Sequence, residues 1–365
     1  MLLYITLFFL LFILTYLEIL SNNKQFSQNS LIIVTTFFFI LSFIRWDTGT
    51  DWEPYFEAFE RIKIPWENLS DKYSEFEWGF MVLYNIAKSL SDSYTMMLFI
   101  EATILYMCMF HVIKTHSLYP IFSLFIYYCM SFAGIFFVRQ NIAMIILLCS
   151  LKYIYERKII PFIIIVCIAS LIHRTAIIFL LSYPIYKYYY SLKFIIVSVL
   201  ITTLLGLFLT KLMLNMIGGL GLGIISAKIN AYLDLGENDN STTFSTTGIL
   251  IRGLINRAFL VILYLSILNK DRAQNRVLNG LINLNIFGII LYIILTPIAF
   301  SLGRVTAYFD ILQIFILPYL FTKCTFRAKY TIISLLSIYL FFRLYTAIAA
   351  FPQEYIPYKT FIEYY

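Results

Sequence analysis

The sequence predicts an all-α polytopic membrane protein. Of its 365 residues, 61% are hydrophobic and only 13% are charged, whereas a soluble domain carries about a quarter charged residues. The mean hydropathy is +0.83. Apolar runs of roughly 17–25 residues, long enough to cross a bilayer as helices, recur along the chain and indicate about ten to twelve transmembrane helices.

These apolar runs define the expected helices in order. The expected spans are residues 1–20, 31–45, 78–90, 94–113, 119–138, 141–155, 159–182, 193–217, 248–268, 279–302, 304–322 and 330–347. The first run lacks a positive n-region and a small-residue cleavage site, so we interpret it as a retained helix rather than a signal peptide. The two longest polar stretches, about 46–77 and 218–247, are too short to fold alone. We therefore expect a single transmembrane domain over residues 1–365.

The charge pattern predicts the orientation. Lys and Arg concentrate in the short loops 151–159, 269–276 and 322–329, which we place in the cytoplasm. The loop 46–77 holds nine acidic and three basic residues, so we place it outside, with loop 218–247 and the tail after Tyr345. If all twelve segments cross the membrane, loop 151–159 lies outside, which conflicts with its positive charge. Either segment 78–90 is therefore re-entrant, or a later segment is broken near His173.

The cysteines and the dispersed positive charge indicate no further chemistry. The five cysteines lie in or beside apolar runs without CxxC spacing, which is typical of packing residues. No His, Asp and Cys set has metal-ligand spacing, so we predict no fixed transition metal. The net charge of +7 is spread over short loops, which argues against a nucleic-acid-binding face.

Polar residues in or beside the apolar runs mark the candidate site, because ionisable groups in membrane helices are costly and often functional. They are Arg45 with Asp47 and Asp51, Glu75 with Glu77, Arg139 with Gln140, His173 with Arg174, and Arg304 with Tyr308 and Asp310. Each has a simpler interpretation, since an arginine at a helix end can snorkel to the surface and a lone histidine is commonly a packing residue. The predicted orientation nevertheless places Arg45, Arg139 and Arg304 at outer helix ends, where guanidinium groups bind phosphate bidentately. An anionic lipid head group is the expected partner.

The polar segments resemble, in order, those of the EpsG-type branch of the Wzy polysaccharide polymerases. They are "IRWDTGTDWEPYFEAFE", "EFEWGFMVLYNI", "FFVRQNIAMIILLCSLKYIYERKIIPFIIIVCIASLIHRTAIIFLL", "SLGRVTAYF" and "YIPYKTFIEYY". The resemblance implies a GT-C-like glycosyltransferase of the bacterial inner membrane that needs no cofactor. It would join oligosaccharide repeat units carried on undecaprenyl diphosphate at the outer face, with the lipid diphosphate as leaving group. A chain-length regulator protein is a further implied partner.

This resemblance assigns roles to the polar residues. Arg139 and Arg304 lead the expected diphosphate-binding residues, followed by Arg45 and Arg174. The acceptor hydroxyl needs a base, for which we rank His173 and Asp51 equally and Glu77 behind them. Asp51 could instead cap the amphipathic helix that follows it. The expected sugar-binding residues are Gln140, Trp52, Tyr55, Tyr308 and Tyr358, although an interfacial aromatic belt also explains some aromatic residues.

Two other function classes fit the same inventory. A transporter or flippase for the lipid-linked oligosaccharide would also need a basic, aromatic cavity, but the sequence shows no inverted repeat. An O-antigen ligase would use the same leaving group with another acceptor, and an O-acetyltransferase would need a cytoplasmic acyl donor.

Overall fold

The computed structural model describes residues 1–363 except 22, 68–75, 137–138, 209–245 and 298–299. These residues are helical almost throughout. The single extended pairing within the described part is a bridge between Arg45 and Thr360. The predicted all-α class is confirmed. Most of the predicted outer loop 218–247, and Glu75, lie outside the described residues.

Seven helical segments in the described part are long and apolar enough to cross a membrane, judged by length and composition. They are α1 (Leu2–Ser21), α2 (Lys24–Ile44), α5 (Tyr94–His116), Leu250–Arg272 within α14 (Thr246–Arg272), α15 (Arg276–Leu295), the segment Arg304–Lys323 and α20 (Phe326–Ala350). Four shorter apolar stretches accompany them, at Pro120–Gly134, Ile159–Ile172, Arg174–Ile185 and Leu192–Gly206. The chain is therefore a multi-pass membrane protein.

The remaining elements are shorter. They are α3 (Trp52–Glu60), α4 (Trp78–Leu90), α6 (Pro120–Ser131), η1 (Phe132–Gly134), α7 (Arg139–Cys149), α8 (Leu151–Tyr155), α9 (Ile159–Ile172), η2 (Arg174–Leu181), α10 (Ser182–Ile185), α11 (Leu192–Phe208), α16 (Phe300–Gly303), η3 (Arg304–Thr306), α17 (Ala307–Asp310), α18 (Gln313–Ile316), η4 (Leu317–Tyr319), α19 (Leu320–Lys323), α21 (Pro352–Tyr355) and η5 (Phe361–Glu363).

Several predicted boundaries were wrong for identifiable reasons. Helix α2 begins seven positions before the expected residue 31, because Asn23 accepts the backbone N–H groups of Gln25 and Phe26 and caps the helix. The span expected at 119–138 is interrupted at Phe132, which adopts a left-handed conformation. The segment expected at 141–155 is divided into α7 and α8. The break predicted as one alternative near His173 is present, since α9 ends at Ile172.

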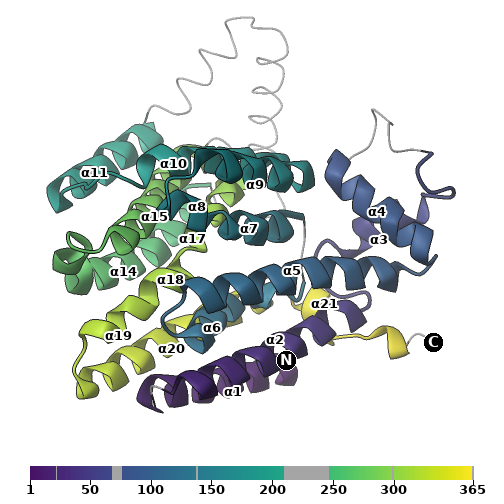
Figure 1. Ribbon diagram of the computed structural model, residues 1–365, viewed down its shortest axis with the longest axis horizontal. Helices are drawn as coiled ribbons and strands as arrows, with labels where there is room; N and C mark the ends of the chain where they lie inside the picture. Colours follow the sequence, from purple (N-terminus) through teal and green to yellow (C-terminus); the bar gives the residue numbers. More distant parts are fainter. Residues whose placement is uncertain (22, 68–75, 137–138, 209–245, 298–299, 364–365) are drawn as a thin grey trace, which may run out of the picture. The chain divides into compact units, whose positions relative to one another are not determined.

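Residue contacts divide the chain into two compact units. Unit 1 comprises Met1–Leu180 with Leu317–Tyr365, and unit 2 comprises Leu181–Ile316. In unit 1, α2 packs on α5, α1 on α6, α6 on α20, and α7 on both α5 and α9. Figure 1 shows α1, α2, α5 and α20 with their axes nearly aligned within this unit, and α2 returns antiparallel to α1. In unit 2, α11, α14 and α17 all pack on α15.

One end of unit 1 is rich in basic residues, and we call it the basic end. There the His116 ring of α5 meets the Tyr155 ring of α8, with centroids 5.3 Å apart, and Tyr119 meets Phe321 of α19 at 5.7 Å. The helix ends and loops that gather here carry Lys24, Lys114, Lys152, Arg157, Lys158, Lys323, Arg327 and Lys329. This end unites two loops that the sequence analysis placed in the cytoplasm.

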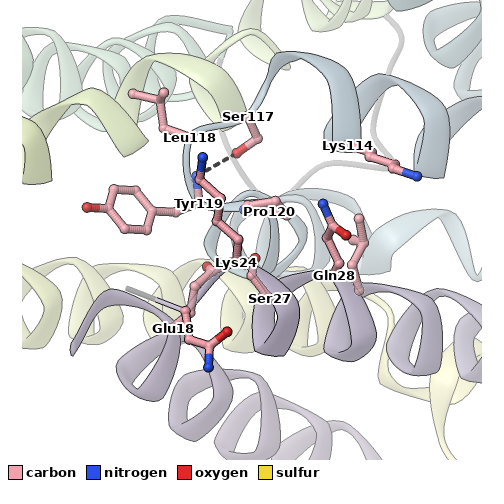
Figure 2. Close-up of a pocket in the computed structure, with 11 residues that line it drawn as sticks. Glu18, Lys24, Ser27, Gln28, Lys114, Ser117, Leu118, Tyr119 and Pro120 are labelled. Carbon is pink, nitrogen blue, oxygen red and sulfur yellow. Dashed lines mark hydrogen bonds between the residues drawn. The ribbon is translucent and has the colours of Figure 1, made fainter. Parts of the chain in front are cut away.

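A buried carboxylate organises the basic end. Glu18 of α1 accepts the backbone N–H groups of Ile121 and Phe122, both at 3.0 Å, and so satisfies donors at the start of α6. Figure 2 shows Glu18 together with Lys24 and Lys114 around a cavity of about 210 Å³. Glu18 therefore links α1 to α6 by hydrogen bonds at this end.

The opposite end of unit 1 joins the loop after α2 to residues near 360. The Trp46 N–H donates to the Lys359 carbonyl oxygen at 3.0 Å, and Lys359 Nζ lies 2.5 Å from Asp47 Oδ2. The Tyr4 hydroxyl donates to the Tyr355 carbonyl oxygen at 2.6 Å. We call this the acidic end, because it carries the acid-rich loop that begins at Trp46.

Helix α4 lies at the acidic end without crossing the unit. Its 13 residues extend about 20 Å, less than the roughly 30 Å of a bilayer core. Phe80 near its start packs on Tyr55 of α3, and Lys88 near its end lies 3.9 Å from Glu60 at the end of α3. Because α4 does not cross the unit, the alternating directions of the other helices bring loop 151–159 to the basic end. These contacts agree with the alternative in which segment 78–90 does not span the membrane.

Candidate active site

A polar cluster in unit 1 is centred on Glu77, whose side chain is 9% exposed. One carboxylate oxygen, Oε2, accepts a hydrogen bond from Arg139 Nη1. The other, Oε1, lies 3.2 Å from His173 Nδ1 and accepts the backbone N–H of Arg174 at 3.1 Å. Together with Tyr55, these residues form what we call the Glu77 cluster.

Three helix ends bring the cluster together. Glu77 precedes α4, Arg139 begins α7, and His173 follows the last residue of α9. The close approach of α4 to α9 requires Gly79, because a Cβ atom there would lie 2.7 Å from the Leu171 Cβ and 2.8 Å from the Leu171 carbonyl oxygen. The local structure of α4 and α9 thus determines how Glu77 meets His173.

Aromatic rings hold the Arg139 guanidinium in place. Its Nε donates to the Tyr55 hydroxyl at 3.1 Å, and its Cζ lies 4.4 Å from the centroid of the Phe76 ring. The Tyr55 and Phe76 rings are stacked, with centroids 5.2 Å apart. Cation–π contact adds to the ion pair with Glu77. The charge of Arg139 is therefore already balanced within the cluster.

The Glu77 carboxylate is strongly stabilised in its charged form. Burial opposes ionisation, but hydrogen bonds from His173 and the Arg174 backbone, together with the Arg139 charge, outweigh it and lower the pKa of Glu77 from 4.5 to about 2. At neutral pH this carboxylate can only accept hydrogen bonds.

The ionised carboxylate fixes the tautomer of His173. Because Glu77 accepts, the proton of a neutral His173 must sit on Nδ1, and the lone pair remains on Nε2. The His173 side chain is 24% exposed, so it is accessible from one side. A histidine oriented by a buried carboxylate is the arrangement that general-base catalysis uses.

Arg174 places an exposed cation beside this histidine. Its backbone N–H is held by Glu77, while the residue begins η2 and its side chain is exposed. Within the residues that the structure describes, the Arg174 guanidinium has no hydrogen-bond or ion-pair partner. An anion reaching His173 would therefore meet this charge.

Other predicted residues of unit 1 lie outside the Glu77 cluster. Arg45 is buried, and its Nη1 donates to the Thr48 carbonyl oxygen at 3.0 Å. Asp51 occupies the N-cap position of α3 as one alternative expected, but its side chain makes no capping hydrogen bond. Trp52 is buried and stacks on Phe56 with ring centroids 4.8 Å apart.

Four further predicted residues have separate places. Gln140 follows Arg139 in α7 and is half-buried. The Tyr358 hydroxyl donates to the Leu41 carbonyl oxygen at the acidic end. In unit 2, Arg304 is exposed at the start of η3, and Tyr308 is buried in α17.

An ion pair in unit 2 includes an arginine that was not among the predicted site residues. Arg257 of α14 pairs with Asp310, with Nη2 2.5 Å from Oδ2 and Nε 3.2 Å from Oδ1. The Arg257 guanidinium also lies 3.7 Å from the Tyr292 ring centroid. The sequence pattern could have identified Arg257, because an arginine within the apolar run "LINRAFLVI" needs a partner for its charge.

Across the described residues, no group of three or more His, Cys, Asp or Glu side chains could hold a metal ion.

Comparison with known proteins identifies the family. No curated protein and no solved structure matches the chain. The family model described as "EpsG family" matches residues 28–360, which include the whole Glu77 cluster and all of unit 2. The chain therefore belongs to the EpsG family of Wzy-type polysaccharide polymerases.

Proposed function

We propose that this polymerase joins oligosaccharide repeat units carried on undecaprenyl diphosphate, and that the Glu77 cluster is its active site. Membership of the family supports a polysaccharide repeat-unit polymerase in general. The observation that carries the finer proposal is the contact of His173 Nδ1 with the ionised, buried Glu77. It leaves Nε2 of His173 oriented to take a proton.

The proposed step is a single displacement at the donor sugar. A hydroxyl of the incoming unit gives its proton to His173 Nε2 while its oxygen bonds to C1 of the growing chain. The bond between C1 and the diphosphate oxygen breaks, and the lipid diphosphate leaves with the electron pair. No nucleotide is consumed, because the lipid diphosphate is itself the leaving group. Glu77 stabilises the imidazolium that forms.

The two arginines of the cluster take different roles in this proposal. Arg139 is paired with Glu77 and anchored by Tyr55, so it positions the carboxylate. Arg174 is exposed next to His173 and is the better residue to stabilise the charge that develops on the diphosphate. This reverses the expected order, which ranked Arg139 first and Arg174 lower.

The charge distribution of unit 1 supports an outer location for the cluster. The basic end corresponds to the cytoplasmic side by the positive-inside rule, and both α5 and α9 have one end there. The 14 residues of α9 rise about 21 Å and the 23 residues of α5 about 35 Å. His173 therefore lies far from the basic end but below the outer end of α5. We place the cluster in a recess of the inner membrane's outer face, where a lipid diphosphate head group can reach it.

The decisive experiment uses purified protein in lipid nanodiscs with a lipid-diphosphate-linked repeat unit. We expect wild-type protein and His111→Ala, a control at an exposed histidine of α5, to give a ladder of polymer. We expect His173→Ala to give none, and Arg174→Ala to lose most activity while Arg61→Ala, at another exposed arginine, retains it. Undiminished polymer from His173→Ala would overturn the assignment of the base. Transfer of one unit to a different acceptor, or transport without polymer, would instead indicate a ligase or a flippase.

A further inference from the structure

The cavity at the basic end of unit 1 is lined by charged groups of both signs (Figure 2). Glu18 of α1 lines it together with Lys24 and Gln28 of α2, Lys114 of α5 and the loop that joins α5 to α6. Its volume of about 210 Å³ can hold several water molecules, and so it can also hold a compact polar group. None of these residues belongs to the Glu77 cluster.

Glu18 brings to this cavity a carboxylate that has no cationic partner among the described residues. The residue is 2% exposed. Its Oε1 accepts hydrogen bonds from Ser27 Oγ and the Ile121 N–H, and its Oε2 accepts the Phe122 N–H. A carboxylate has about four acceptor positions, so one position on Oε2 is left over. Because burial makes an isolated carboxylate costly, a cation in the cavity would stabilise Glu18.

The two lysines of the cavity supply the opposite charge. Within the described part of the chain, neither forms an ion pair with a carboxylate. Lys24 is exposed at the start of α2, and Figure 2 shows its side chain extending towards residues 117–119. Lys114 is exposed near the end of α5, and its Nζ lies 5.5 Å from the centroid of the Phe110 ring. The cavity therefore offers one place for a cation, at Glu18, and one for an anion, at the lysines.

The exposed surfaces of α2 and α5 become apolar with distance from the cavity. The two helices pack together, and α2 begins at the basic end where α5 ends. Successive exposed residues along them are Lys24, Gln28 and Ile32 on α2, and Lys114, His111 and Met107 on α5. From Lys24 to Ile32 the helix rises about 12 Å, within the roughly 15 Å of one leaflet. A ligand with a polar head in the cavity and acyl chains over Ile32 and Met107 matches this change.

We propose that the cavity binds the phosphoethanolamine head group of a phospholipid from the cytoplasmic leaflet. Glu18 accepts an N–H of the ligand ammonium group, and Lys24 and Lys114 bind its phosphate. The leaflet follows from the predicted orientation, which places the basic end in the cytoplasm. A purely anionic head group would leave Glu18 without a cation, and a trimethylammonium group has no N–H to donate. The lipid connects α1, α2 and α5 and takes no part in the reaction at the Glu77 cluster.

Lipid retention by the full chain tests the proposal without reference to activity. Purified protein is delipidated in detergent and given an equimolar mixture of dioleoyl phosphatidylethanolamine, phosphatidylcholine and phosphatidylglycerol, and native mass spectrometry counts the bound lipids. We expect phosphatidylethanolamine to bind at least about tenfold more tightly than the other two, because only it makes the charged hydrogen bond to Glu18. Replacing both Lys24 and Lys114 by Gln should weaken its binding at least about tenfold. Lys152→Gln, at an exposed lysine outside the cavity, should leave it unchanged.

Glu18→Gln tests the cation position by itself. It keeps an oxygen acceptor but removes the charge, so we expect the preference for phosphatidylethanolamine over phosphatidylcholine to disappear. Thermal unfolding shows whether this variant is folded, and the lysine variants, which change exposed side chains, decide the proposal if it is not. Equal binding of phosphatidylglycerol, or binding of phosphatidylethanolamine that survives the lysine substitutions, would overturn the proposal. Displacement of the lipid by soluble phosphoethanolamine at the same concentration would assign the site to a free solute and overturn the lipid assignment.

Discussion

Replacing Glu77 by Gln is the sharpest test of the Glu77 cluster. The amide keeps the shape of the side chain but removes the negative charge that faces Arg139 and the Nδ1–H of His173. The amide cannot stabilise a charged His173 imidazole, and the positive charge of Arg139 is no longer balanced by a carboxylate. We expect the substitution to impair both proton transfer and local stability.

The pKa of Glu77 gives a magnitude for the effect on stability, and general-base chemistry gives one for the effect on rate. Lowering the pKa of Glu77 from 4.5 to about 2 corresponds to about 3 kcal/mol at 1.36 kcal/mol per pH unit. Partial solvent screening reduces the expected loss in free energy of unfolding to about 2 kcal/mol. Loss of an orienting carboxylate from a general base typically costs 10²- to 10⁴-fold in rate, so we expect polymer synthesis to fall by about that factor.

The two effects need separate assays. Polymer formation in nanodiscs measures the rate, with Glu57→Gln at an exposed glutamate of α3 as the control. Unfolding of detergent-solubilised protein measures stability against pH. Because the folded pKa of Glu77 is lowered, its contribution is complete above pH 4.5 and disappears as the pH falls towards 2. The stability difference between wild type and Glu77→Gln should therefore be constant above pH 5 and shrink below it. A variant with a wild-type rate would refute the role of the carboxylate.

Three further substitutions test the supports of the site and of the fold. Gly79→Ala should reduce polymer synthesis at least about tenfold, because its Cβ would meet the Leu171 backbone and move Glu77 away from His173; wild-type activity would contradict this. Arg139→Lys should lower the rate while leaving crosslinking of lipid diphosphate unchanged, since an ammonium cannot reproduce the paired contacts of the guanidinium; reduced crosslinking would indicate a direct substrate contact instead. Glu18→Gln should lower the free energy of unfolding by about 1–3 kcal/mol without changing the rate per folded molecule, as thermal unfolding and active-fraction measurements would show.

Composition and hydropathy predicted the membrane class correctly, because they depend on the whole chain rather than on any contact. Helix boundaries were less predictable where local geometry decides them. Asn23 extends α2 by capping it, and the left-handed conformation of Phe132 interrupts a run that remains apolar. Hydropathy reports neither effect.

The sequence also identified every member of the Glu77 cluster as a candidate site residue, without showing how they combine. Glu77, Arg139 and His173 were each selected as polar residues beside apolar runs, yet Glu77 ranked last among the bases and Arg139 first among the phosphate ligands. Glu77 and His173 are 96 positions apart, and no periodic pattern encodes such a pairing. The contacts motivate a different division of roles, in which Glu77 orients His173 and Arg139 holds the Glu77 carboxylate in position.

The joining of the loop after α2 to residues 354–360 has a consequence for biosynthesis. The Gly49 N–H donates to the Glu354 carbonyl oxygen at 2.7 Å, and the Lys359 N–H donates to Thr48 Oγ1 at 3.1 Å. Partners separated by about 300 positions emerge from the ribosome at very different times. A nascent chain can insert its first helices long before this loop has its final neighbours. Translation past residue 359 is therefore what completes the acidic end, and a chain that stops before Glu354 leaves the loop without either bond.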